Sequence, residues 1–112
     1  MNWIKLEQPD QLDQIQKQAD NKKVLIFKHS TRCSISRAAL DRLERNWKEE
    51  EMENVQPFFL DLISYRQLSD QIALKFDVEH ESPQILVIKN GESIYDSSHL
   101  AIDYNAIKDV VQ

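Results

Sequence analysis

The feature that most constrains the fold is a strand-like run joined to a helix-like run around position 30. Residues 24–27 read VLIF, a compact apolar run with the length and composition of a buried strand. After a polar turn, apolar residues recur at spacings of three and four, which is helical periodicity. These residues are Ile35, Ala38, Ala39, Leu43 and Trp47. The pattern predicts a buried strand, a turn, and a helix that runs to about Glu50.

Cys33, the only cysteine of the chain, lies in the turn where this helix begins. A helix N-terminus presents unpaired N–H groups and a partial positive charge, and both favour the reactive thiolate over the thiol. The alternative is a small core residue, since unpaired cysteines are often buried. The flanking residues are polar, which is typical of an exposed turn and favours a reactive cysteine. They are Ser30, Thr31, Arg32, Ser34 and Ser36.

Length and charge narrow the class of protein. The chain has 112 residues, enough for one core, so we expect a single domain over residues 1–112. Its formal net charge of −5 argues against a nucleic-acid partner. No apolar run has the length of a membrane span, and the first residues lack the apolar segment of a signal peptide, so no membrane partner is expected. One cysteine cannot form an internal disulfide, which predicts a reducing, cytoplasmic location.

The rest of the chain alternates between strand-like and helix-like segments. Further strands are expected over residues 3–6, 55–62, 84–89 and 92–96, and helices over residues 9–21, 65–76 and 103–111. The first of these helices is marked by Leu12, Ile15 and Ala19 and ended by Asp20-Asn21. Asn90-Gly91 predicts a tight hairpin turn, because both residues tolerate positive φ. Alternating βα units imply parallel strands, and the hairpin adds antiparallel ones. We therefore predict an α/β fold in which helices cover both faces of a central mixed β-sheet.

This order of elements, with Cys33 at the head of the second helix and Ser82-Pro83 just before the hairpin, resembles the thioredoxin fold. The resemblance implies that Pro83 follows a cis peptide bond and packs beside Cys33. It also implies that the backbone at Ser82 and Pro83 pairs with an extended segment of a substrate protein. Ser36 stands where a second, resolving cysteine would be.

More narrowly, the strings FKHSTRCSIS and HESPQILVI look like the monothiol bacilliredoxins of bacillithiol-producing Gram-positive bacteria. The resemblance covers nearly the whole chain, although members of that family usually carry a proline where this chain has Ser34. It implies a thiol–disulfide oxidoreductase that removes bacillithiol from S-bacillithiolated client proteins. The implied partners are those clients, together with free bacillithiol or a partner redoxin for recycling. Bacillithiol would act as a substrate or co-substrate, with no bound cofactor.

Four residues near Cys33 are candidates to support its thiolate. Thr31 is expected to cap the helix through its hydroxyl. Arg32 is expected either to stabilise the thiolate, to bind a carboxylate of bacillithiol, or simply to be exposed. Ser36 either hydrogen-bonds the thiolate or is inert. His29 either assists proton transfer or is a surface histidine of the turn.

Two further residues, His80 and Lys28, are weaker candidates. His80 lies close to Pro83 in sequence and is expected either to reach the same cleft as Cys33 or to have no role there. Lys28, at the end of the strand, is a weaker candidate than His80. One cysteine and three scattered histidines lack the ligand spacing of a zinc site, so no metal is expected.

Two other function classes remain open from the sequence. One is a non-enzymatic binding module of the same fold, in which Cys33 is incidental or senses peroxide. The other is an iron–sulfur carrier similar to the monothiol glutaredoxins. It is disfavoured because the Gly-Phe of their Cys-Gly-Phe-Ser motif is absent here.

Overall fold

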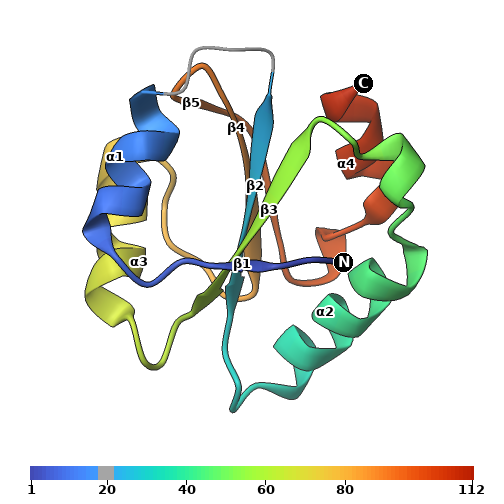
Figure 1. Ribbon diagram of the computed structural model, residues 1–112. Coiled ribbons are helices and arrows are strands. Elements are labelled where there is room, and N and C mark those ends of the chain that lie inside the picture. The colour runs from blue at the N-terminus through green and yellow to red at the C-terminus, as the bar shows by residue number, and fades with distance from the viewer. Residues whose placement is uncertain (18–21) are drawn as a thin grey trace.

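A computed structural model describes residues 1–17 and 22–112, and it places a five-stranded β-sheet between two pairs of α-helices (Figure 1). The strands are β1 (Ile4–Lys5), β2 (Lys23–His29), β3 (Val55–Asp61), β4 (Gln84–Lys89) and β5 (Glu92–Ser98). The helices are α1 (Pro9–Lys17), α2 (Ser34–Asn46), α3 (Arg66–Phe76) and α4 (Tyr104–Val111), with short 3-10 turns η1 (Glu49–Glu51) and η2 (His99–Ala101). The expected contribution of Ala19 to the first helix, and its expected end at Asp20-Asn21, lie outside the described residues.

The strands follow the order β1-β3-β2-β4-β5, so β2 is at the centre of the sheet. It pairs in parallel with β3 and antiparallel with β4, and β4 pairs antiparallel with β5. Every residue of β2 from Val24 to His29 is buried. A central strand covered on both faces explains why its apolar run does not alternate with polar residues. The predicted mixed sheet of an α/β fold is confirmed.

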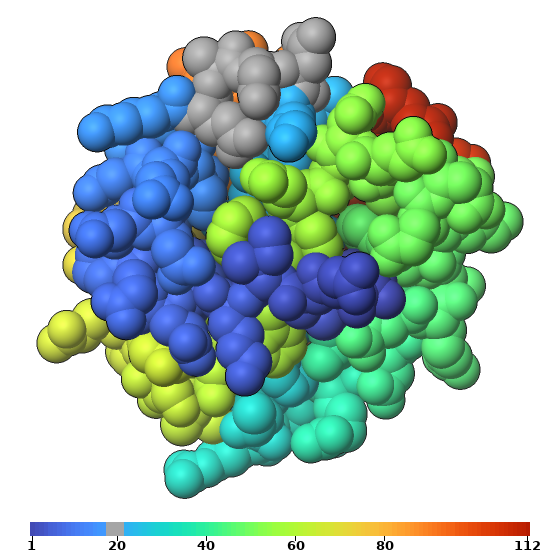
Figure 2. All heavy atoms as spheres, in the orientation of Figure 1, coloured from blue at the N-terminus to red at the C-terminus, as the bar shows by residue number. Residues whose placement is uncertain are grey.

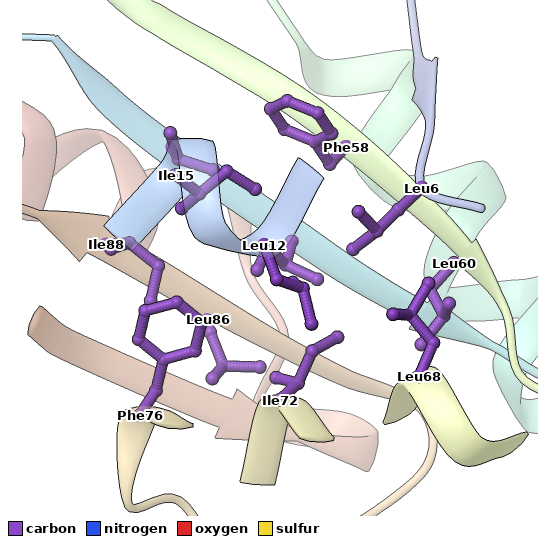
Figure 3. Close-up of a cluster of buried hydrophobic side chains, with 12 residues drawn as sticks. Leu6, Leu12, Ile15, Phe58, Leu60, Leu68, Ile72, Phe76, Leu86 and Ile88 are labelled. Carbon is purple, nitrogen blue, oxygen red and sulfur yellow. The ribbon is translucent and has the colours of Figure 1, made fainter. Parts of the chain in front are cut away.

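The two faces of the sheet carry separate cores. On one face α1 and α3 pack over Val24 and Ile26 of β2. Figure 3 shows side chains of α1 and α3 in this core, among them Leu12 and Ile72. On the other face α2 and α4 pack over Leu25 and Phe27. Successive side chains of a strand point to opposite faces, so neighbouring residues of β2 serve different cores. The predicted covering of both faces by helices is confirmed.

The hairpin between β4 and β5 turns at Asn90-Gly91, as predicted. Asn90 has φ of 53° and Gly91 has φ of 76°, both in the left-handed region. Gly91 also lies close to α1, because a Cβ added there would overlap the carbonyl oxygen of Gln16. The turn therefore requires glycine at this position for its backbone conformation and for its contact with α1.

The helix that follows Cys33 differs from the prediction in its end and in its inward face. It ends at Asn46, not near Glu50, because Trp47 adopts extended backbone angles and packs its ring against Tyr104, with ring centroids 6.0 Å apart. The predicted stripe included Ile35, which is in fact 50% exposed. Ala39 and Leu43 of the predicted stripe are buried, and Ser36, which was not part of it, is buried as well. The strand β5 also extends to Ser98, two residues beyond its expected end.

Candidate functional site

Cys33 lies at the N-cap position of α2, immediately after a tight turn at the end of β2. Its backbone N–H donates to the carbonyl of Ser30 at 3.2 Å, and its carbonyl accepts the N–H of Arg37 at 3.1 Å. Its side chain is partly exposed. The turn and the start of α2 reach the surface at the lower edge of the molecule (Figure 2). The sulfur is therefore held at a fixed place that a second molecule can reach.

The N-cap position suits a thiolate because of the backbone around it. A side-chain atom at this position faces the N–H groups of the second and third helical residues, which here are Ile35 and Ser36. These N–H groups have no carbonyl partner within the helix. In the structure the side chain of Cys33 makes no cap hydrogen bond. A thiolate is a far better acceptor than a thiol, so ionisation of the sulfur would supply the missing cap.

Thr31 and Arg32 lie in the exposed turn before Cys33. The prediction that Thr31 caps α2 is wrong, because the N-cap residue is Cys33 and no side-chain cap hydrogen bond is present among the described residues. Thr31 precedes the cap by two residues, in the turn closed by the bond between Cys33 and Ser30. Arg32 is exposed beside the sulfur-bearing residue and remains a candidate to meet an anionic group there.

Ser36 is fully buried in the first turn of α2, and its hydroxyl contacts residues at the end of β2. The hydroxyl oxygen accepts the N–H of Ser30 at 3.0 Å and lies 2.7 Å from Nδ1 of His29. Because Ser30 donates to this oxygen, the single hydroxyl proton is free to donate to His29. Ser36 thus links the cysteine-bearing helix to both residues that precede the turn, which neither sequence-based alternative for Ser36 anticipated.

His29 is the last residue of β2 and lies on the face covered by α2. It is 4% exposed, and its ring centroid lies 5.4 Å from that of Phe59, so the alternative of a surface histidine in the turn is wrong. Burial, followed by the positive charge of Arg37, holds the pKa of His29 below its ordinary value of 6.5. The imidazole is therefore neutral at neutral pH, and Nδ1 is an acceptor for Ser36 if the proton is on Nε2.

Pro83 follows a cis peptide bond from Ser82, as the resemblance implied, and lies at the same end of the sheet as the cysteine turn. Register pairs Lys28 of β2 with Gln84 of β4, so Pro83 stands next to the end of β2. The N–H of His99 donates to the carbonyl of Pro83 at 3.0 Å. His99 also lines a mainly apolar hollow together with Ser34, the neighbour of Cys33. The turn η2 therefore lies between the proline and the beginning of α2.

A buried hydroxyl and an exposed hollow lie near the cysteine turn. Ser82 Oγ is buried and has no hydrogen-bond partner among the described residues. The hollow is bordered by Ile35 and Leu100, which are 50% and 84% exposed. Exposed apolar side chains next to a reactive group are typical of a surface that receives another polypeptide.

His80 and Lys28 lie on the opposite face of the sheet from His29. Lys28 is fully buried, and its Nζ is 3.4 Å from Nδ1 of His80. Ser69 of α3 places its hydroxyl 3.3 Å from the same nitrogen. Burial lowers the pKa of Lys28 to about 8, and burial together with Lys28 and Arg66 lowers the pKa of His80. The burial of Lys28 was missed, although the strand alternation that places Val24 and Ile26 in one core also places Lys28 there.

Within residues 1–17 and 22–112, no group of three or more histidine, cysteine, aspartate or glutamate side chains is arranged to hold a metal ion. No helix within these ranges has both the length and the apolar character needed to cross a membrane.

Comparisons with known proteins agree with this geometry. The sequence profile of the monothiol bacilliredoxin family, BrxC, matches residues 4–107. Among solved structures, a candidate oxidoreductase with a thioredoxin fold is 35% identical, with a TM-score of 0.81 over 97% of this chain and 93% of its own. Thioredoxin from Malassezia sympodialis is 16% identical, with a TM-score of 0.75 over 98% of this chain and 88% of its own. Thioredoxin from Trypanosoma brucei brucei is 8% identical, with a TM-score of 0.73 over 96% and 86%. The two thioredoxins show the likeness of fold alone.

Proposed function

Because this chain belongs to the monothiol bacilliredoxin family, we propose that it uses Cys33 to remove bacillithiol from S-bacillithiolated proteins. The family and the thioredoxin fold make it a thiol–disulfide oxidoreductase. The proposal that Cys33 removes bacillithiol rests on the position of this single cysteine. Cys33 is partly exposed at the N-cap of α2, at the end of the sheet that also carries the cis Ser82–Pro83 bond.

The first step is a thiol–disulfide exchange at the bacillithiol sulfur of the client's mixed disulfide. The Cys33 thiolate forms a new S–S bond to that sulfur, and the bond to the client sulfur breaks. The client leaves as a thiolate, which takes a proton from water. The products are a repaired client thiol and Cys33 joined to bacillithiol, and the number of disulfides is unchanged.

The second step needs an external thiol, because the chain has one cysteine. Free bacillithiol attacks the mixed disulfide at Cys33, releases the Cys33 thiolate and leaves as bacillithiol disulfide, with loss of one proton. A partner redoxin with two thiols could take the same place. Ser36 occupies the position of a resolving cysteine but bears a hydroxyl, which does not exchange with disulfides.

Recognition of the client would combine the backbone beside Pro83 with the surface around Cys33. An extended client segment can pair with the backbone at Ser82 and Pro83, as a strand adds to a sheet edge. Arg32, exposed next to Cys33, supports binding of a carboxylate of bacillithiol.

Turnover with and without an external thiol tests this proposal. A peptide that carries bacillithiol on its one cysteine is mixed with the protein, and the released peptide thiol is quantified. We expect release to stop at one thiol for each protein molecule and to resume when bacillithiol is added. Ser36→Cys should let the protein resolve its own adduct to an internal disulfide, since the second thiol is at high effective concentration. A protein that releases no peptide thiol, with or without bacillithiol, would contradict the proposal.

A further inference from the structure

Lys28 is a charged side chain enclosed in the core, and stability alone does not explain it. It is fully buried, and it has no salt bridge within the part of the chain that the structure describes. Replacing buried ions with apolar residues of similar volume is often neutral or stabilising. Lys28 does contact His80, with Nζ 3.4 Å from Nδ1. The lysine therefore links the central strand β2 to the loop that joins α3 to β4.

A second buried polar side chain, on the neighbouring strand β4, hydrogen-bonds to the same loop between α3 and β4. Gln84 is 1% exposed and is the register partner of Lys28 across the antiparallel pair of β2 and β4. Its amide donates to the carbonyl of Glu79 at 2.9 Å and accepts the N–H of Glu81 at 3.4 Å. Opposite residues of such a pair lie on one face of the sheet. Lys28 and Gln84 thus lie side by side, and both hydrogen-bond to the segment of residues 79–81.

Residues 79–81 lead directly into Ser82 and the cis bond to Pro83. We propose that Lys28, acting through His80, is a positioning residue that fixes residues 79–83 for backbone pairing with the client, which rests on the proposed function. Lys28 does not touch the reacting sulfurs in this account. It sets where the backbone beside Pro83 lies, and so determines how well a polypeptide substrate is presented to Cys33.

This role requires an unprotonated Nδ1 on His80, because a protonated ring nitrogen cannot accept from Lys28. The charged groups around the pair are Arg66 and Asp70 on α3 and Glu81 in the connection itself. Burial, Lys28 and Arg66 lower the pKa of His80, so its ring is neutral at neutral pH, and Nδ1 accepts from Lys28 in the tautomer whose proton is on Nε2. As the pH falls through that lowered pKa, His80 gains a charge next to Lys28. The contact is then lost, and reaction with polypeptide substrates should weaken on the acid side.

The test compares Lys28→Met with the wild-type protein on three substrates. The first is a peptide whose single cysteine carries bacillithiol, the second is the same peptide carrying glutathione, and the third is bis(2-hydroxyethyl) disulfide, which has no peptide backbone. Lys89→Met is the matched control, because Lys89 lies at the opposite end of the same β2–β4 pair, opposite Lys23. Initial rates give KM and kcat for each substrate at several pH values.

We expect Lys28→Met to raise KM for the peptide about tenfold and to flatten the acid side of its pH profile. Its rate with the small disulfide should stay within about twofold of wild type, because Cys33 is untouched. Lys89→Met should match wild type throughout. Unchanged peptide KM in Lys28→Met would overturn the inference, as would equal slowing with the small disulfide. If wild type accepts the glutathione peptide but not the bacillithiol peptide, the proposed function fails, and the role of Lys28 is then decided on the glutathione peptide.

A second pair of variants separates positioning from folding. His80→Leu leaves a buried ammonium without its acceptor, so its urea midpoint should fall below that of wild type. Adding Lys28→Met to His80→Leu removes the unpaired charge and should restore the midpoint. The peptide KM of the double variant should stay raised, because the contact is still absent. A double variant in which KM recovers together with stability would show that Lys28 serves folding alone, and it would overturn the inference.

Discussion

Ser36→Ala tests the internal link between the cysteine-bearing helix and the central strand. The serine hydroxyl accepts the N–H of Ser30 at 3.0 Å and lies 2.7 Å from Nδ1 of His29. Alanine fits the same space and favours helix, so its direct effects on packing and helix propensity are small. The substitution therefore isolates the loss of two hydrogen bonds at the end of β2.

The expected magnitude follows from the groups left behind. Nδ1 of His29 would be a buried acceptor without a donor, because His29 is 4% exposed. An unsatisfied buried polar group costs about 1–3 kcal/mol. Ser30 is only partly buried, so water replaces part of its lost bond. We expect Ser36→Ala to lower the free energy of unfolding by about 2 kcal/mol.

The assay is urea unfolding at pH 7, with Ser34→Ala as the matched control. Ser34 is exposed in the same first turn of α2, so its substitution should change stability by less than about 0.5 kcal/mol. The slope of the free energy against urea should be the same in all three proteins, since the surface exposed on unfolding is unchanged. A Ser36→Ala protein as stable as the Ser34→Ala control would refute the view that this hydroxyl fastens α2 to β2.

Three further predictions concern stability. The pKa values of His29 and His80 are lowered in the folded state, so the unfolded chain takes up protons first as the pH falls below about 6.5. Between pH 7 and pH 5 the urea midpoint of the wild-type protein should fall by more than that of His29→Gln. Equal falls in the two proteins would contradict the lowered pKa of His29. Gly91→Ala should lower the thermal midpoint markedly, because its Cβ would overlap the carbonyl of Gln16, and a shift within error of wild type would contradict that close approach. Lowering the pKa of Lys28 from 10.5 to about 8 corresponds to about 3 kcal/mol of destabilisation at neutral pH, so Lys28→Met should be more stable than wild type at pH 7. That advantage should shrink between pH 8 and 10.5, where only the unfolded chain keeps the proton, and a constant difference would contradict the shift.

The fold was largely predictable because its signals are local. The unbroken apolar run of β2 indicates a strand covered on both faces, and Asn90-Gly91 specifies a tight turn through the positive φ that both residues accept. The cysteine at the start of α2 also follows from local periodicity. The end of that helix was not predictable in the same way. It depends on Trp47, which leaves the helix to pack against Tyr104, a residue 57 positions later in the chain.

The polar contacts of the site depend on register and on distant partners, which the sequence does not display. His29 and His80 both seemed able to reach Cys33, but strand alternation places His29 under α2, whereas His80 lies against α3. Ser36 falls on the inward stripe of α2 in place of Ile35, and the prediction missed this because it followed apolar residues alone. Lys28 is buried by the strand alternation that also buries Val24 and Ile26, although lysine side chains are almost never fully buried unless they are paired.

Intact-mass measurement of the protein after reaction with a bacillithiolated peptide tests the central claim most directly. With no free bacillithiol present, the account predicts one bacillithiol on the protein, located at Cys33 by fragmentation, and an equal amount of peptide with a free thiol. Cys33→Ser should remain unmodified and should leave the peptide bacillithiolated. If bacillithiol stays on the peptide after mixing with the wild-type protein, while the protein still binds that peptide, Cys33 is not the acceptor and the enzymatic account is wrong.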